Sequence, residues 1–147
     1  MQQTDGFTII EVLLAIALLT VIVMVVMSGL TGSFRLSGNS TLQSVATNRS
    51  QAVIESIRGQ WQTVSQYNSA CVQLPTVSGI TTTISVQDEN VDGSSVGSPY
   101  SPTISSNCSS VAALANIRPL RRVTVTSTNT SGSNIGQSKL TVEIARP

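Results

Sequence analysis

The chain has 147 residues, of which 10% are charged and 3% aromatic, and its formal net charge is +1. This length suits one modest domain plus a membrane segment, and the weak charge argues against a nucleic-acid binder held by bulk electrostatics. The sequence has no histidine and two cysteines, which removes the commonest general base, an imidazole-based triad and a cysteine-rich zinc site. We therefore expect no enzyme, and we assign no catalytic, cofactor-binding or metal-binding residue.

Residues 7–27 form an apolar run that is interrupted by Thr8, Glu11 and Thr20. As a helix, the run would be roughly 30 Å long, which matches the hydrocarbon thickness of a bilayer. It is apolar on every face, unlike a helix that packs one stripe on a soluble core. Residues 1–6 contain no Lys or Arg and no small-residue cleavage signal follows the run, which argues against a secretory signal peptide. The sequence predicts a retained transmembrane helix over residues 7–28.

Glu11 is the costly residue of this run. An acidic side chain at mid-membrane costs about 2.5–3.5 kcal/mol on insertion scales, so it needs a partner or a function. A cut between Gly6 and Phe7 would create an α-amino cation one helical turn before Glu11. That cation could belong to the same subunit or, in a bundle of such helices, to a neighbouring subunit. In the second case, charge neutralisation inside an apolar core would select subunits.

The stretch GFTIIEVLLAIALL, residues 6–19, resembles the N-terminal signature of the type IV pilin family. The family includes type IV pilins, minor pilins and the pseudopilins of type II secretion and DNA-uptake machines. The resemblance implies a leader, residues 1–6, that a prepilin peptidase removes after Gly6, and N-methylation of the new terminus at Phe7. It also implies that Glu11 directs assembly into a helical fibre. Asp5 stands in the leader where the family usually has Lys or Arg, which puts the start site in question but not the cut site.

The stretch after the span, residues 29–67, is expected to continue as a helix. Gly29, Gly32 and Gly38 each cost about 1 kcal/mol relative to Ala in a helix, so they predict a weakened or locally melted segment, with a plain loop as the alternative. Helical periodicity then resumes from Leu42 and runs to about Tyr67, with one apolar side that should lie on a sheet. Trp61 is expected to pack in the core.

Residues 68–147 are expected to form a globular β-sheet domain of three or four antiparallel strands. Strands are predicted by alternation at residues 79–87, 121–129 and 139–145, with a turn at Asp92-Gly93 and a long hairpin loop at 130–138. Residues 94–110, with Pro99 and Pro102, are expected to be surface loop, and residues 109–117 a short helix or apolar loop. The apolar residues predicted to face the helix are Val123, Val125, Leu140, Val142 and Ile144. The fold class is thus α+β, a long helix packed on a small antiparallel sheet, and the resemblance implies the ladle shape of pilins.

Cys71 and Cys108 lie beyond the apolar run. If this part of the chain is exported, one intramolecular disulfide is expected, and closing a loop of this size would stabilise the fold by about 3–4 kcal/mol. Two buried free thiols in a cytosolic fold are the alternative.

Two further patterns have a functional and a plain interpretation. Asp88, Asn90 and Asp92 have the spacing that opens a calcium loop, but Pro99 stands where a bidentate Glu is expected, and a solvated turn is the preferred interpretation. The second pattern is an arginine cluster, which could contact DNA phosphates in an uptake pilus, although a solubilising flank of an edge strand is preferred. This cluster consists of Arg118, Arg121 and Arg122.

Together, the residues and the resemblance predict a structural subunit of a bacterial type IV pilus or pilus-like fibre, such as a minor pilin. Its partners would be other pilin-like subunits, the prepilin peptidase and methylase, the inner-membrane assembly platform and the membrane, with DNA weakly supported. It would start as a single-pass inner-membrane protein with its globular domain outside the cytoplasm, and end in a fibre in the periplasm or at the cell surface. The alternatives are a pseudopilin of a secretion or DNA-uptake machine and an uncleaved, membrane-anchored binding module.

Overall fold

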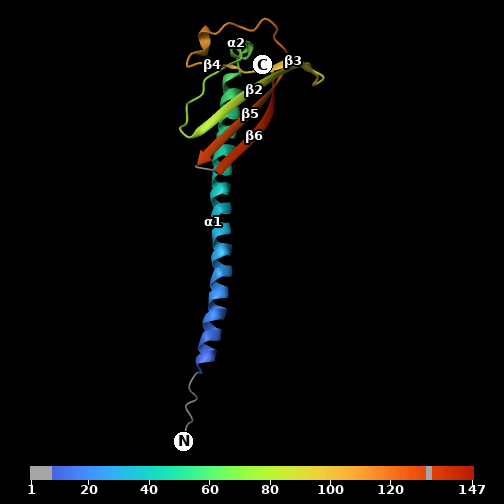
Figure 1. The fold of residues 1–147 in the computed structure, drawn as a ribbon. Helices are drawn as coiled ribbons and strands as arrows, with labels where there is room; N and C mark the ends of the chain where they lie inside the picture. Colours follow the sequence, from blue (N-terminus) through green and yellow to red (C-terminus); the bar gives the residue numbers. More distant parts are fainter. Residues whose placement is uncertain (1–7, 132–133) are drawn as a thin grey trace. The chain divides into compact units, whose positions relative to one another are not determined.

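The computed structural model describes residues 8–131 and 134–147 and has the predicted α+β composition (Figure 1). It divides into two units, residues 1–38 and residues 39–147, which are described separately below. The elements, in chain order, are α1 Ile9–Gln60, α2 Val64–Ser69, β1 Cys71–Val72, β2 Ile80–Glu89, β3 Ser95–Tyr100, β4 Thr103–Ile104, the 3-10 turn η1 Cys108–Ser110, β5 Leu120–Ser131 and β6 Asn134–Ala145.

Helix α1 is continuous over 52 residues, so the predicted melted segment or loop at the three glycines is wrong. Gly29, Gly32 and Gly38 all lie in helical backbone. Extending an existing helix adds one hydrogen bond for each residue that it fixes. Three separated glycines lower that gain without cancelling it, so the helix passes through them.

The helical stretch predicted to reach Tyr67 is broken at residues 61–63, between α1 and α2. At this point Trp61 turns into the core, where it is 1% exposed, as the sequence predicted. Thr63 then caps α2 by accepting a hydrogen bond from the Gln66 backbone N–H, and α2 ends at Ala70 in the left-handed conformation with φ of 48°. A cap of this kind supplies a partner for an otherwise unpaired helical N–H, which favours a new helix over a continued one.

The main sheet has four antiparallel strands in the order β3-β2-β5-β6. The predicted long hairpin loop at 130–138 is wrong, because β5 and β6 stay paired up to Ser131 and Asn134. A backbone ladder needs no apolar side chains to continue, so the strands run past the point where apolar alternation stops.

The predicted surface loop at 94–110 also contains regular structure, namely β3 and β4. Pro99 lies within β3, an edge strand, where a missing N–H donor is tolerated. Strand β4 pairs with β1 in a separate two-stranded parallel sheet. The segment 109–117, predicted as a short helix or apolar loop, is irregular after η1.

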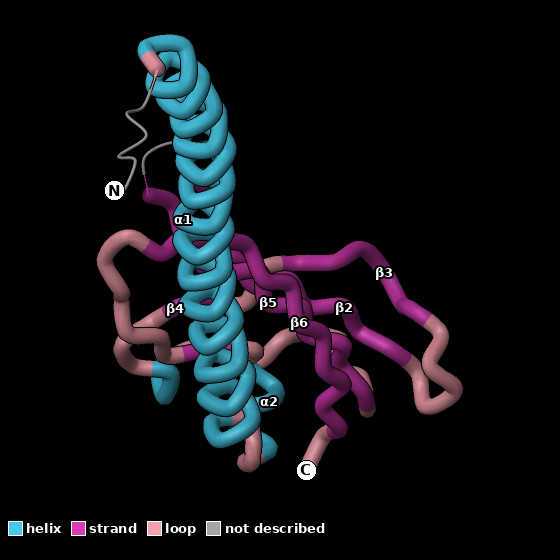
Figure 2. The backbone as a smooth tube through the Cα atoms, turned by 90° about the horizontal axis from the view of Figure 1, so that it is seen from below, coloured by secondary structure: helices cyan, strands magenta, loops and turns pink. Residues whose placement is uncertain are grey.

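The core of the 39–147 unit lies between one face of the main sheet and α1, and Figure 2 shows the strands gathered beside this helix. Val123 and Val125 are fully buried, and Leu140, Val142 and Ile144 pack partly buried against the core, as their alternation predicted. The buried residues of this core are Val53, Ile54, Ile57, Trp61, Tyr67, Ala70, Val72, Ile84, Val86, Val123 and Val125.

Helix α1 and strand β6 meet at Gly136. A Cβ atom at this position would lie 2.3 Å from the Leu42 carbonyl carbon, so the two backbones touch directly. Next to this contact, the Gln43 side chain donates to the Gln137 carbonyl at 2.6 Å and accepts from the Gln137 N–H at 3.2 Å. The helix is therefore held to the sheet by a glycine contact and by an amide that bonds strand backbone.

We expect Gly136→Ala to lower the free energy of unfolding by about 1–3 kcal/mol, because the added methyl group overlaps the helix backbone and neither chain can move freely. Chemical denaturation of the detergent-solubilised chain would measure this. Gly59→Ala is the matched control: nothing lies within 4 Å of its new Cβ, and the substitution should raise helix stability by up to about 1 kcal/mol. Equal stability of the Gly136→Ala variant and the parent would contradict the direct backbone contact.

Candidate functional site

The first half of α1 has the length and composition expected of a membrane span. Its most apolar 18-residue window has a mean hydropathy of 3.1 and is 0% buried, so this helix is long and apolar enough to cross a membrane. Large apolar side chains are exposed on consecutive residues, for example Leu13 at 63% and Leu14 at 61%. The exposed surface is therefore apolar all round, as predicted from the sequence, and not a single stripe.

The hydroxyl groups within this half of α1 bond to the helix itself. Thr20 donates to the Ile16 carbonyl at 2.8 Å, Ser28 to Val25 at 2.9 Å and Thr31 to Met27 at 2.9 Å. Polar groups in lipid must find partners inside the protein, and these hydroxyls have found theirs within one turn. They therefore place little demand on water or on a neighbouring chain.

Glu11 differs from these hydroxyls, because it is the one ionisable residue in positions 8–34 of the sequence. It lies in the first turn of α1, where its N–H and that of Val12 donate to the Thr8 carbonyl at 3.1 and 3.3 Å. The positive end of the helix dipole favours a carboxylate here. Among the described residues, no Lys or Arg lies within ion-pair distance of the Glu11 carboxylate. The predicted processing residues, Gly6 and Phe7, lie outside the described residues.

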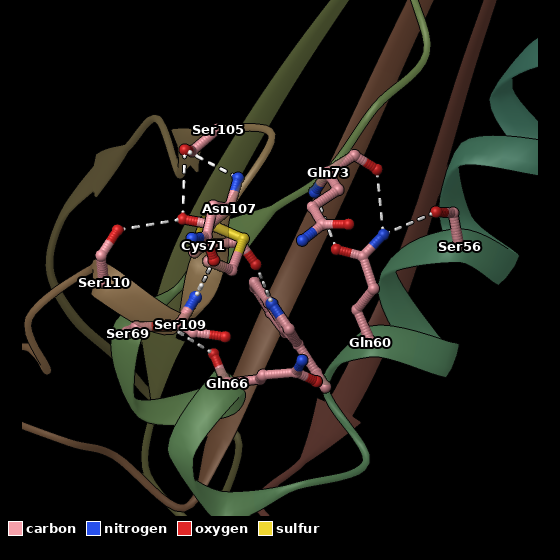
Figure 3. The surroundings of a disulfide bond; sticks show 12 residues. Ser56, Gln60, Gln66, Ser69, Cys71, Gln73, Ser105, Asn107, Ser109 and Ser110 are labelled. Carbon is pink, nitrogen blue, oxygen red and sulfur yellow. Dashed lines mark hydrogen bonds between the residues drawn. A yellow bond between two sulfur atoms is a disulfide. The ribbon is translucent and has the colours of Figure 1, made fainter.

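The predicted disulfide is present between Cys71 on β1 and Cys108 on η1, with a Cα–Cα distance of 5.5 Å (Figure 3). The structure thus has a bonded pair and not the two free thiols of the alternative. The bond closes a loop across a sequence separation of 37 residues that holds β2, β3 and β4, and closing such a loop stabilises the fold by about 4 kcal/mol in the chain-entropy model. The Trp61 indole N–H donates to the Cys71 carbonyl at 2.9 Å, which ties the disulfide to the core.

A second glutamine of α1 bonds to the backbone two residues after Cys71. Gln60 donates to the Gln73 carbonyl at 2.9 Å and accepts from the Gln73 N–H at 2.7 Å, as Figure 3 shows. Gln43 makes the same pair of bonds with Gln137. Each of the two side-chain amides replaces the hydrogen bonds that a neighbouring strand would make, because it offers one donor and one acceptor to one backbone residue. Sequence reasoning missed both, since a single amide on a helix carries no periodic signal.

The three arginines do not form one surface patch, so the edge-strand interpretation fails. Strand β5 is an inner strand, and Arg121 on it is 0% exposed. Its Nε lies 3.0 Å from Asp88 Oδ1, its Nη1 donates to the Tyr67 carbonyl, and its guanidinium carbon lies 4.3 Å from the centre of the Tyr67 ring. Arg121 therefore cannot reach a DNA phosphate in this structure.

Arg122 points to the opposite face of β5. Its Nη2 lies 2.7 Å from Glu89 Oε1 and 3.4 Å from Glu143 Oε1. The Glu89 side chain is 0% exposed and that of Arg122 is 40% exposed. This arginine thus neutralises a buried carboxylate and an exposed one.

The residues with calcium-loop spacing do not converge. Asp88 is partly buried at the rim of the core, where it pairs with Arg121 and accepts the Tyr100 hydroxyl at 3.2 Å. Asp92 accepts the backbone N–H and the hydroxyl of Ser94, and these hydrogen bonds lower the pKa of Asp92. Asn90 donates to the Ser94 hydroxyl. In the parts of the chain that the structure describes, no group of three His, Cys, Asp or Glu side chains could hold a metal ion.

The ion pair of the buried Arg121 with Asp88 could have been found from alternation. Asp88 continues the apolar series Ile84, Val86 on β2, and Arg121 precedes the series Val123, Val125 on β5. Residues two apart share a face of a strand, and the register places Asp88 directly opposite Arg121. A negative residue at a core-facing position of one strand and a positive residue at a core-facing position of another predict an ion pair between them.

Comparison of the chain with protein-family models, with curated proteins and with solved structures found no match.

We expect Asp88→Leu to lower the free energy of unfolding by about 3–5 kcal/mol, because it leaves Arg121 buried without a counter-charge. The double variant Asp88→Leu, Arg121→Met should be more stable than this single variant, since it removes both charges. Glu55→Leu is the control for loss of an exposed ion pair, whose side chains are 50% and 70% exposed, and should cost less than about 1 kcal/mol. Denaturant titration measures all three. A double variant less stable than Asp88→Leu would show that Arg121 is not held by this charge.

Both tyrosines should resist ionisation in the folded protein. Burial raises the pKa of Tyr67 from its ordinary value of 10.0 to about 12, and burial also raises the pKa of Tyr100. The ultraviolet absorbance of phenolate should therefore stay low at about pH 10–11 and rise there once denaturant is added. Because the unfolded tyrosines lose their protons first, this contribution to stability is full below about pH 10 and is lost towards pH 12. Native titration near pH 10 would contradict the burial of both hydroxyl groups.

Proposed function

We propose that this chain is a structural subunit of a bacterial type IV pilus or pilus-like fibre. In this proposal the chain is inserted by the first half of α1, cut after Gly6, N-methylated at Phe7 and assembled through the same helix. The observation that carries the proposal is a helix that is apolar on all sides and bears one carboxylate, Glu11, in its first turn, for which the described residues offer no ion-pair partner.

The exposed apolar side chains of α1 supply the driving force. In water, each large one would cost about 1.5–3 kcal/mol relative to burial, so this half of α1 must stay in lipid or pack against similar helices. Hydroxyls that are satisfied within the helix allow either environment. Moving from the membrane to a bundle of such helices therefore exchanges one apolar solvent for another.

Glu11 supplies the selectivity. A carboxylate without a counter-charge is costly in lipid and in a helix bundle alike. The amine that cleavage after Gly6 would create at Phe7 offers the missing cation, from the same subunit or from a neighbour. Since the described residues provide no other cation for Glu11, its need for a partner favours the assembled state.

The 39–147 unit suits a mechanical role on the outside of a fibre. It has its own core, and the Cys71–Cys108 disulfide closes the loop that holds three of its strands. Disulfides persist in oxidising compartments outside the cytoplasm. The proposed partners are other pilin-like subunits, the prepilin peptidase and the inner-membrane assembly platform.

The mature N-terminus distinguishes the proposal from an uncleaved, membrane-anchored module. Mass spectrometry of the protein purified from its membrane should show a chain that begins at methylated Phe7. An intact leader in assembled fibres would overturn the proposal, because the amine that pairs with Glu11 would not exist.

We expect Glu11→Ala to leave membrane insertion intact and to reduce incorporation into fibres at least about tenfold, since the loss of one buried ion pair removes more than about 1.4 kcal/mol. Immunoblotting of sheared fibres and of membranes would measure both quantities. Thr20→Ala is the matched control, because its hydroxyl bonds to its own helix, and it should assemble like the parent. Normal assembly of Glu11→Ala would count against the charge-pairing mechanism.

A further inference from the structure

The two edges of the main sheet differ in how they are protected. Strand β3 carries Pro99 and the positive-φ Gly97, and its register with β2 shifts between Val86 and Asp88. Prolines and irregularities of this kind keep an edge from pairing with another chain. Strand β6 has 12 residues, no proline and an unbroken register with β5, so its edge is regular.

The hydrogen-bond alternation identifies which residues of β6 face outward. The Arg146 N–H donates to the Pro119 carbonyl at 2.8 Å, and bonded residues alternate along an antiparallel pair. Ser138, Leu140 and Val142 therefore bond to β5, whereas Lys139, Thr141 and Glu143 turn their backbone N–H and C=O groups to the open edge. Gln137 fits this phase, because its own outward groups are taken by the Gln43 side chain.

We propose that this open edge pairs with the same edge of a second copy of the chain, antiparallel, about a twofold axis at Thr141. In this register Lys139 of each copy lies opposite Glu143 of the other, on the same face of the joined sheet. Opposite charges stabilise directly opposed positions, and like charges destabilise them. Registers centred on Lys139 or Glu143 would instead oppose like charges, and registers centred on Leu140 or Val142 would leave both charges opposite uncharged residues. Only the register at Thr141 pairs Lys139 with Glu143.

The other face of the strand supports the same register. Leu140 and Val142 are partly buried against the core of their own copy, and the twofold axis places Leu140 of one copy opposite Val142 of the other. Apolar pairs at such positions stabilise sheets. The ladder stops at Lys139, because Gln43 already occupies the backbone groups of Gln137.

This contact is distinct from the helix packing proposed for the fibre. A twofold axis perpendicular to a sheet reverses every direction that lies in the plane of that sheet. The segment 39–60 of α1 packs on the sheet face, so it would run in opposite directions in the two copies. The edge contact therefore goes beyond the proposed function and does not depend on it.

Cross-linking of the full chain tests the interface. Thr141→Cys places one thiol of each copy at the axis, with directly opposed Cβ atoms about 4.5–5.5 Å apart, and a short thiol-specific cross-linker should join them. The described residues contain no free cysteine that could compete. Thr83→Cys is the control: Thr83 is also exposed on the sheet but lies on the inner strand β2, so it should not be joined. Mass spectrometry of the linked peptides would identify the pair of positions.

Charge exchange tests the register. In the Thr141→Cys background, Lys139→Glu alone and Glu143→Lys alone should each reduce cross-linking at least about fivefold, because each opposes like charges twice. A mixture of the two variants should recover the parent level as mixed pairs, since all opposed charges are again opposite. Cross-linking should also persist in Glu11→Ala, whose fibre assembly is expected to fail.

Three results would overturn the proposal. The first is equal cross-linking at Thr83→Cys and Thr141→Cys. The second is a mixture of charge variants that stays as low as either variant alone, which would indicate a different partner for this edge. The third is loss of the cross-link in Glu11→Ala, which would show that the contact follows from fibre assembly and not from the strand edge.

Discussion

The 39–147 unit depends on one buried cation, the guanidinium of Arg121. Burying an unpaired charge is very costly, so the surrounding elements supply partners: β2 provides Asp88 and α2 provides the Tyr67 carbonyl and ring. Strand β3 adds the Tyr100 hydroxyl, which donates to the same Asp88 oxygen. The Trp61 ring lies 5.4 Å from the guanidinium carbon and, through its indole N–H, connects this cluster to the disulfide strand. The break between α1 and α2 lets Trp61 and Tyr67 pack edge to face, with ring centres 5.7 Å apart, and brings both rings close to the guanidinium of Arg121.

The two halves of helix α1 differ in how much of their apolar surface the protein buries. In residues 39–60 one face is buried against the sheet, and its fully buried members recur at steps of three and four residues: Ala46, Ser50, Val53 and Ile57. In residues 9–34 apolar side chains surround the helix, and in the part of the chain that the structure describes all of them are exposed. A stripe can be satisfied by one sheet, whereas a fully apolar surface needs a solvent of lipid or of other helices. The sheet therefore buries the apolar face of residues 39–60, whereas the apolar surface of the N-terminal half of α1 needs lipid or other helices around it.

Sequence reasoning succeeded where side-chain pattern decides the structure and failed where the backbone decides it. Apolar alternation located β2, β5 and β6 and the core faces of Val123 and Leu140, because period two fixes which face is buried. The same reasoning ended β5 too early, began β6 too late and missed β3, since polar residues can extend a ladder and an edge strand tolerates Pro99. It also predicted one arginine cluster because the residues are close in sequence, although neighbouring residues of a strand, such as Arg121 and Arg122, face opposite sides of the sheet. For the candidate site, Glu11 was recognisable because a carboxylate in an apolar run is costly, whereas Gly6 and Phe7 rest on a resemblance alone.

Arg121 and Glu11 differ in where the structure offers an opposite charge. Both are ionisable side chains in apolar surroundings, and each needs an opposite charge. Arg121 has Asp88 3.0 Å away on the neighbouring strand, so its need is met when the domain folds. Glu11 has no such partner among the described residues, and no Lys or Arg lies in positions 1–34 of the sequence. Under the proposed function, the amine that cleavage after Gly6 would create at Phe7 would supply this counter-charge, so Glu11 would act in assembly, whereas Arg121 acts in folding.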